Sequence, residues 1–560
     1  MNPLILKGIR ERLRTKHLIA SALFSLILSA TLYLSAYFNG MQEHQHYDPA
    51  IQSVRTMAEN PINGARNAFP LLLGFQGFLL MFLGTGRVAS VTAEEKETGL
   101  LDYQRMTPMS PFSKIGGYLF GLPAREYFMF FLTIPFLIHC VVVGKLPWLN
   151  ILHLYSVFFC SVLFYHLTAH VIGLVVPRPR AASWVSRIAV LGLYIFLPVL
   201  GQAGISFLSF LTILPTYFGK ILPSLLFIGE NRLGRLESKA AEFWQDVPFF
   251  NLSISPSAFT FFMQGLIILT LIITAYRKWR NEALPAFSKP SGLILYTIFQ
   301  FLLLGSLWAF FSDGKANGLL GETFSTNMVG PFGKPEIAMV VVQSVYFALS
   351  FLAILALVNI CCPNLHLYLK GLQRSQKLEL HKIPWAADEG SGFWFVGLLS
   401  LITAAVHAIF TSLANSSEIW NLQSTIFSTI SIPFLVVLAS SLYLQACRAQ
   451  RFTLGFWGFV GLLWITPLLA SLVVAVGWQN EHLSNIFKLL ALNPITWTPL
   501  HLLSENSDSL NIPEQVVEDL NQAIWLGITI ALALAIILQV RLYWKRNQRN
   551  RSIKTSFKND

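Results

Sequence analysis

The chain has 560 residues, of which 54% are hydrophobic, 13% aromatic and only 12% charged. Soluble proteins carry about 25% charged residues, so this composition excludes a soluble globular protein and indicates a polytopic membrane protein. We attribute the formal net charge of +12 to loops that face anionic lipid, and we expect no nucleic-acid partner. The five cysteines show no C-x-x-C spacing, which predicts neither a disulfide framework nor a zinc site.

Apolar runs of about 20 residues, the length that crosses a bilayer, follow one another along the chain. They predict an all-α polytopic membrane protein with twelve transmembrane helices. Their expected bounds are 18–38, 68–86, 124–144, 150–176, 188–210, 258–276, 291–312, 337–361, 392–413, 425–447, 453–477 and 522–541.

Positive charge indicates the orientation of these helices, because lysine and arginine resist translocation. With the N-terminus inside, the cytoplasmic segments hold 30 of the 40 lysines and arginines. This bias persists in alternate loops, so we expect both termini to be cytoplasmic.

The order of spans and loops divides the chain into two similar halves, 1–280 and 281–560, the second with a basic C-terminal tail. Each half has its longest cytoplasmic loop after its second span and a large external excursion before its sixth span. The two excursions, 211–257 and 478–521, are too polar or too broken to cross, which is typical of interfacial or re-entrant helices. Twelve spans also occur in other transporter folds, so this symmetry alone does not identify the family.

The long cytoplasmic loop of the first half contains a charged, turn-rich stretch, 87–117. Thr92 and Glu95 have the spacing of a helix capping pair, and Glu94, Glu95 and Glu97 crowd the turn that would follow. The pattern predicts a short helix that begins near Thr92.

Leu100 and Leu101 would give this helix one apolar side, and Gly99 is a candidate break. Pro108 and Pro111 end any helix and force a turn. We therefore expect a short amphipathic element at the bilayer surface between two spans. The alternative is an ordinary solvated loop whose charges only keep it out of lipid.

The motif E-K-E-T-G-L-L at 95–101, followed by M-T-P-M-S-P at 106–111 and by Lys114, resembles the signature of the ABC-2 type export permeases. The opening stretch 2–14 is similar to the amphipathic lead-in of the same permeases. In that family the acidic helix and the T-P-x-S-P turn form the coupling region, which docks on a separate ATPase subunit. The residues that this resemblance assigns to the coupling helix are Glu94, Glu95, Lys96, Glu97, Gly99, Leu100, Leu101, Pro108 and Pro111.

The long cytoplasmic loop of the second half, 362–391, predicts an amphipathic basic helix instead of an acidic one. Lys370, Arg374 and Lys377 supply its charge. We expect a second, weaker contact with the ATPase there. A basic helix that lies on the membrane surface is the alternative.

Signatures of catalysis are missing from the sequence. There is no G-x-x-x-x-G-K-[ST] loop, so a partner must bind ATP and Mg²⁺, and we expect neither enzyme activity nor a cofactor in this chain. His166 and His170 lie four residues apart on one face of the fourth span, a spacing that can bind a metal. Histidine is more often satisfied by a neighbouring helix, so we expect no metal site.

The resemblance implies the transmembrane permease of an ATP-driven exporter in a bacterial inner membrane, with one copy of this chain and two ATPase subunits. The substrate is not identified by the sequence, and a lipid-like, amphiphilic or drug-like molecule fits the aromatic spans. One alternative is a twelve-helix secondary transporter without an ATPase, although the spans hold almost no carboxylates for ion coupling. Another is a membrane enzyme that uses His166 and His170.

Overall fold

A computed structural model gives the fold, and most of the residues that it describes are helical. These residues are 2–41, 45–48, 53–56, 60–202, 206–225, 244, 247–250, 252–282, 284–313, 335–380, 383–416, 426–449, 458, 466, 469–470, 488–491, 493–505 and 513–556.

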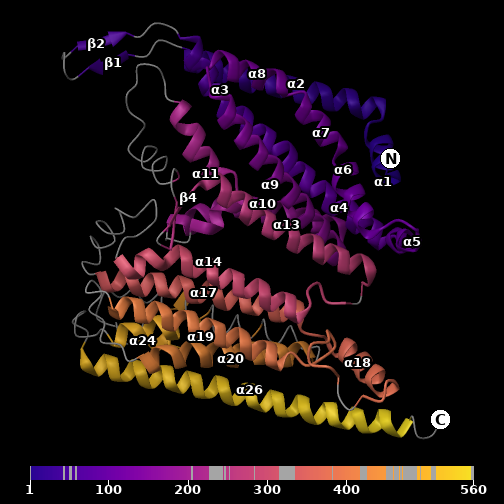
Figure 1. Cartoon of the computed structure of the whole chain (residues 1–560), viewed down its shortest axis with the longest axis vertical. Coiled ribbons are helices and arrows are strands. Elements are labelled where there is room, and N and C mark those ends of the chain that lie inside the picture. Colours follow the sequence, from indigo (N-terminus) through magenta and orange to yellow (C-terminus); the bar gives the residue numbers. More distant parts are fainter. Residues whose placement is uncertain are drawn as a thin grey trace. The chain divides into compact units, whose positions relative to one another are not determined.

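The chain forms two compact units. Unit 1 comprises Met1–Pro248 and Leu252–Glu282, and unit 2 comprises Phe249–Asn251 and Ala283–Asp560. Each unit is a bundle of long helices (Figure 1).

Unit 1 begins with a short helix and then alternates long apolar helices with short ones. Its α-helices are α1 (Pro3–Arg12), α2 (Thr15–Met41), α3 (Pro61–Gly77), α4 (Thr85–Glu97), α5 (Leu100–Met106), α6 (Pro111–Gly121), α7 (Ala124–Phe131), α8 (Ile134–Val143), α9 (Trp148–Val175), α10 (Pro179–Gln202), α11 (Leu214–Thr216) and α13 (Pro256–Arg280). Strands β1 (Gln45–Asp48) and β2 (Ser53–Thr56) pair antiparallel between α2 and α3. Strands β3 (Val247–Phe249) and β4 (Leu252–Ile254) form a second two-stranded sheet.

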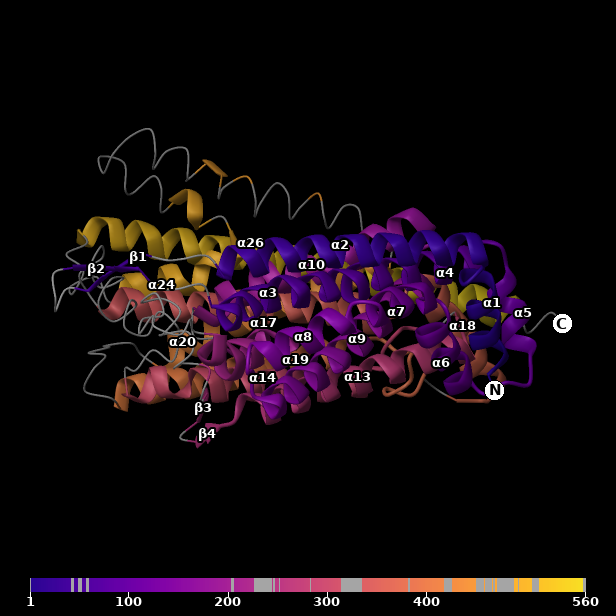
Figure 2. The ribbon, with the colours of Figure 1, turned by 90° about the horizontal axis from the view of Figure 1, so that it is seen from above.

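The longest continuous helical run of unit 1 is Pro61–Glu97, 37 residues in all. Asn60 caps it by accepting a hydrogen bond from the Ile62 N–H, and Pro61 occupies the first turn, where no N–H partner is needed. A π-helical stretch, Phe78–Gly84, joins α3 to α4 within the run. The run packs against α2, which lies beside α3 in both views (Figures 1 and 2), and against α9 and α10.

A close approach fixes the packing of α4 on α9. At Gly173 an added Cβ would lie 2.6 Å from the Cβ of Thr92 and 2.7 Å from the carbonyl oxygen of Ala89. Neither distance is compatible with a real side chain, so only glycine allows the two backbones to meet here.

The short segments between α10 and α13 fold back onto the bundle. The Tyr165 hydroxyl of α9 donates to the carbonyl of Leu211 at 2.9 Å, and the Asn150 amide donates to the carbonyl of Lys220 at 3.1 Å. These side chains satisfy backbone carbonyls that a broken helix leaves open. In the first excursion, where we expected an interfacial or re-entrant helix, 226–243 lie outside the described residues.

Unit 2 consists of long apolar helices with one short amphipathic helix. Its helices are α14 (Lys289–Asp313), α17 (Pro335–Cys361), α18 (Leu365–Lys377), α19 (Phe393–Ser416), α20 (Ile426–Ala449), α24 (Trp497–Glu505) and α26 (Glu514–Ser556). Its core is a cluster of fully buried aromatic and aliphatic side chains, with Phe347 and Phe351 of α17 against Phe395 of α19 and Val436 of α20.

Ten helices of the described residues are long and apolar enough to cross a membrane. The count is eleven if Val345–Cys361 and Leu365–Lys377, which meet at a bend of 52°, form one span. The prediction of a mostly helical, multi-pass integral membrane protein is therefore confirmed, whereas the two short sheets were not expected. The expected span 453–477 lies almost wholly outside the described residues, so the number twelve stays a prediction.

The contact at Gly173 leads to a test of helix packing. In Gly173→Ala the new methyl group should force α4 away from α9 and lower the thermal unfolding midpoint, since overpacking costs about 1–3 kcal/mol. The matched control is Gly265→Ala on α13, where an added Cβ meets nothing within 4 Å. Alanine there should leave the midpoint unchanged or raise it. Equal midpoints for the two variants would contradict the close approach.

Candidate functional site

The segment from α4 to α6 lies at one end of unit 1, and its course differs in one respect from the prediction. No helix begins at Thr92, because α4 already starts at Thr85 and runs on from the preceding helix. The Thr92 hydroxyl is buried and donates to the carbonyl of Val88 at 2.8 Å. The predicted capping pair of Thr92 and Glu95 is therefore wrong. Thr92 is the eighth residue of α4, where the neighbouring N–H groups belong to the continuing helix and need no cap.

Gly99 separates α4 from α5, as the sequence predicted. Its φ of 75° lies in the left-handed region that favours glycine, and it allows the chain to turn between the two helices. The Thr98 hydroxyl donates to the carbonyl of Glu94 at 2.9 Å and so satisfies one of the last carbonyls of α4.

The T-P-M-S-P turn has a direct physical explanation. Ser110 is the N-cap of α6, where its hydroxyl accepts a hydrogen bond from the Ser113 N–H at 3.2 Å, and Pro111 takes the first helical position. Lys114 is buried beneath this turn and donates to the carbonyls of Arg105 and Thr107, both at 3.4 Å. Burial lowers the pKa of Lys114, and the positive charge of Arg105 lowers it further.

A buried carboxylate holds four helices together at this end. Glu95 Oε1 forms an ion pair with Lys7 of α1 at 2.9 Å, and Glu95 Oε2 accepts hydrogen bonds from Gln104 of α5 at 3.2 Å and from the Tyr118 hydroxyl of α6. The Tyr118 hydroxyl also lies 2.7 Å from Gln104 Oε1. Burial raises the pKa of Tyr118 well above its ordinary value, and the charge of Glu95 raises it further, so the hydroxyl remains a donor.

The N-terminal helix α1 is fixed to α6 by two further contacts. The Asn2 side chain caps α1 and donates from Nδ2 to the carbonyl of Ser113 at 2.5 Å. Gly8 meets the backbone of Gly121, because an added Cβ at Gly8 would lie 2.4 Å from the Gly121 carbonyl oxygen. Lys7 is thereby held where it reaches Glu95.

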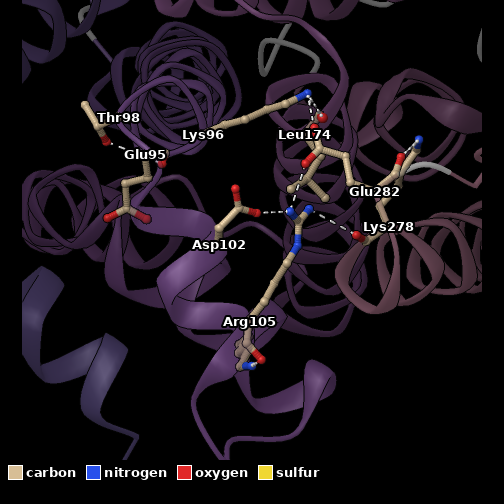
Figure 3. Close-up of polar contacts among 9 residues, drawn as sticks. Glu95, Lys96, Thr98, Asp102, Arg105, Leu174, Lys278 and Glu282 are labelled. Atoms are coloured by element: carbon tan, nitrogen blue, oxygen red, sulfur yellow. Dashed lines mark hydrogen bonds and ion pairs between the residues drawn. The ribbon is translucent and has the colours of Figure 1, made fainter.

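A second cluster of charges ties α5 to the segment that follows α13 (Figure 3). Arg105 Nη1 lies 2.9 Å from Glu282 Oε2 and also pairs with Asp102, while Arg105 Nη2 donates to the carbonyl of Lys278 at 3.3 Å. Lys96 of α4 reaches Glu282 Oε1 at 3.2 Å and the carbonyl of Leu174 at 2.7 Å. The hydrogen bond from Arg105 lowers the pKa of Glu282, and Lys96 adds to this effect.

Several large side chains near the contacts of Glu95 and Arg105 are exposed. Leu100 is 37%, Tyr103 65% and Met106 78% exposed, and the carboxylates of Glu94 and Glu97 also face outward. These five residues are called the exposed α4–α5 surface. Exposed apolar side chains beside carboxylates are typical of a protein-binding site.

The structure therefore divides the predicted coupling residues into three groups by their exposure. Glu94, Glu97, Gly99, Leu100 and Pro108 are exposed, whereas Glu95 and Leu101 are buried and Lys96 and Pro111 are half-buried. Sequence reasoning missed the residues that hold the segment in place. They are Lys7, Gln104, Arg105, Tyr118 and Glu282, and no local sequence signal connects Arg105 to Glu282, because 177 positions separate them.

The basic helix of unit 2, α18, is amphipathic as predicted. Leu367 and Leu372 are buried, whereas Lys370, Arg374 and Lys377 are exposed. Asn364 caps this helix by accepting a hydrogen bond from the Leu367 N–H at 2.9 Å.

The two histidines of α9 each hydrogen-bond neighbouring helices through both ring nitrogens. His166 Nε2 donates to the carbonyl of Leu80 at 3.0 Å, and the Tyr127 hydroxyl lies 3.3 Å from its Nδ1. The Trp279 indole N–H donates to His170 Nε2 at 3.0 Å, and Thr92 Oγ1 lies 3.2 Å from His170 Nδ1. The lone pairs that a metal would need are thus engaged in helix packing. In the described part of the chain, no group of three or more His, Cys, Asp or Glu side chains could hold a metal ion.

Comparison with known proteins identified no relative, because no family model, curated protein or solved structure matches this chain.

The buried carboxylate makes Glu95 the residue on which the position of α5 depends. Glu95→Ala would leave the buried Gln104 amide without its acceptor, at a cost of about 1–3 kcal/mol, and would leave the Tyr118 hydroxyl only Gln104 Oε1 to donate to. We expect a lower thermal unfolding midpoint and faster tryptic cleavage after Arg105. The control is Glu97→Ala, which removes an exposed carboxylate two residues further along and should change neither measurement. Equal behaviour of the two variants would contradict the role assigned to Glu95.

The depressed pKa of Glu282 predicts how the second cluster responds to pH. Its contribution to stability is complete above the ordinary glutamate pKa of about 4.3 and is lost as the pH falls through the lower folded-state value. Glu282→Gln lacks this contribution at every pH. The difference in unfolding midpoint between the wild type and Glu282→Gln should therefore be constant near neutral pH and should shrink below about pH 4. A difference that stays constant under acid would show that the ion pairs do not stabilise the fold.

Proposed function

We propose that this chain is the membrane-spanning subunit of an ATP-driven exporter of the ABC-2 type, and that a separate cytoplasmic ATPase docks on the exposed α4–α5 surface. The observation that carries the proposal is the combination of two features. Tyr103 and Met106 are exposed side chains flanked by carboxylates. They belong to α5, whose position is fixed by the contacts of Glu95 and Arg105. A loop that only keeps its charges in water would not need these buried contacts.

The helix behind this surface supports a mechanical role. α4 is the end of the continuous run Pro61–Glu97, which at 1.5 Å per residue is about 55 Å long. A displacement of α5 by the ATPase would be transmitted to this helical run through Gly99, which joins α5 to α4. Through Arg105 and Glu282 it would also reach α13, so two long apolar helices would respond together.

The sequence supports the assignment of ATP binding to a separate subunit. The chain has no phosphate-binding G-x-x-x-x-G-K-[ST] loop, so in this proposal ATP and Mg²⁺ are bound by the ATPase. We expect one copy of this chain to work with two ATPase subunits, with both termini in the cytoplasm of a bacterial cell. In unit 2, the exposed Lys370, Arg374 and Lys377 of α18 offer a second contact of opposite charge.

The docking role is tested by affinity purification of the tagged full-length chain from the cells that encode it. Wild-type protein should retain an ATPase whose peptides include a P-loop, identified by mass spectrometry. The triple variant Glu94→Lys, Glu97→Lys, Met106→Asp should lose at least nine-tenths of it, a factor of ten that corresponds to about 1.4 kcal/mol of binding free energy. These side chains are exposed, so the variant should keep its thermal unfolding midpoint.

The matched control is Glu11→Lys, which reverses another exposed carboxylate on α1. It should retain the ATPase at the wild-type level. Absence of any P-loop ATPase from the wild-type sample, or its full retention by the triple variant, would overturn the proposed docking site.

A further inference from the structure

Two cavities adjoin each other in unit 1, along the π-helical stretch Phe78–Gly84 and helix α10. One, of 330 Å³, is basic and is lined by Arg87, Arg125, Arg180 and Arg187. The other, of 630 Å³, is almost entirely apolar and lies further along the same two elements. Both volumes fall in or near the range of about 300–1,000 Å³ that is typical of ligand sites.

The basic cavity carries more positive charge than its own residues neutralise. Its one carboxylate, Glu126, already pairs with Arg125 at 3.0 Å. Within the described ranges, no carboxylate lies within ion-pair distance of Arg87, Arg180 or Arg187. Arginine clusters of this kind bind phosphate groups through charge-assisted, bidentate hydrogen bonds.

Arg187 is held in a fixed position although no anion neutralises it. Its guanidinium lies over the ring of Phe82, 5.5 Å from the centroid, and packs against Gly86, where an added Cβ would be 2.1 Å from Arg187 Nε. The same Nε is buried and has no hydrogen-bond partner. Arg187 as a whole is half-buried, so an anion in the cavity can reach the rest of its guanidinium and would neutralise it through charge-assisted hydrogen bonds.

The apolar cavity owes its space to missing side chains on α3. An added Cβ at Gly74 meets nothing within 4 Å, and at Gly77 the nearest atom is Met81 Sδ at 3.9 Å. Phe78 and Leu191, which also line this cavity, are 42% and 51% exposed. The cavity is therefore an apolar slot that is open at the surface of a membrane-spanning helix.

The two cavities are lined by residues that are close in the chain on both elements. Phe82 lines the apolar cavity and Leu83 lines the basic one, while on α10 Arg187 is followed one turn later by Val190 and Leu191. The basic cavity is the one nearer to the exposed α4–α5 surface, because Arg87 and Glu97 belong to the same helix α4. This arrangement, a cationic pocket at a helix end and an apolar slot in the spanning region, matches a lipid with an anionic headgroup.

We propose that unit 1 binds one phospholipid-like molecule, with its phosphate headgroup on the arginines of the basic cavity and a hydrocarbon chain in the apolar cavity. Charge complementarity selects an anionic lipid over a zwitterionic one. The proposal does not depend on an ATPase partner, since every residue that carries it lies in unit 1.

The experiment uses the purified full-length chain in a neutral detergent. Phosphatidylglycerol should raise the thermal unfolding midpoint and remain bound in native mass spectrometry, whereas phosphatidylcholine at the same concentration should do neither. Inorganic phosphate and glycerol phosphate should bind at least tenfold more weakly than phosphatidylglycerol, because they have no hydrocarbon chain to bury in the apolar cavity.

Two variants test the two cavities separately. Arg180→Gln with Arg187→Gln should weaken phosphatidylglycerol binding about tenfold or more, because the two substitutions remove charge-assisted hydrogen bonds to the phosphate. Gly74→Leu should fill the apolar cavity, weaken phosphatidylglycerol to a similar extent and leave the weak binding of inorganic phosphate unchanged. The control Arg178→Gln removes an exposed arginine outside both cavities and should bind like the wild type.

The outcomes that overturn the proposal are specific. Equal stabilisation by phosphatidylcholine and phosphatidylglycerol would indicate ordinary lipid contact without a headgroup site. Full stabilisation by inorganic phosphate, with no effect of Gly74→Leu, would indicate an anion site without a lipid. The unfolding midpoint of each variant without added lipid shows whether it is folded, and Arg87→Gln replaces the double variant if that one is not.

Discussion

The buried carboxylate of Glu95 is the interaction on which one end of unit 1 depends. It joins α1, α5 and α6 to the last turn of α4, and each of these helices contributes one donor to it. The ion pair with Lys7 is partly exposed and contributes little by itself. The hydrogen bonds from Gln104 and Tyr118 are buried, so removal of their common acceptor leaves the Gln104 amide without a partner inside the protein and Tyr118 with Gln104 as its one remaining acceptor.

Much of the fold could be predicted from the sequence, because long apolar runs have only one stable form in a bilayer. The spans, the break at Gly99 and the turn at Pro111 all follow from local chemistry. The position of Thr92 could not be predicted in this way. Its capping pattern with Glu95 is a local signal, and the helix that continues from the preceding span overrides it.

The local breaks of the α4–α6 segment could be predicted from the sequence, whereas the burial of its residues could not. Glu94, Glu95 and Glu97 form one acidic motif in the sequence, yet the helix turns Glu95 inward and the other two outward. Nothing in the local sequence distinguishes them, because the distinction depends on where α6 supplies Tyr118. The pair of Arg105 and Glu282 is still harder to foresee, since it joins segments that meet only after the bundle has formed.

The arginines of unit 1 fall into two physical classes. Arg105 is neutralised by Glu282 and Asp102, and its charge serves the fold. Arg187 is held by an aromatic ring and a glycine instead, so its position is fixed but its charge is not neutralised. A positive charge that is held in place but not neutralised is available to a ligand. We therefore assign the lipid headgroup to arginines such as Arg187 and not to Arg105.

The π-helical stretch Phe78–Gly84 has a consequence for how the length of this helix can vary in evolution. A wide turn accommodates one residue more than an α-helical turn, and His166 Nε2 donates to the buried carbonyl of Leu80 within it. Loss of one residue here would return the stretch to ordinary α-helical geometry. Elsewhere in the helix the same deletion would rotate every following side chain by about 100°. A deletion of one residue at this turn should therefore leave the same helix faces presented on both sides of it.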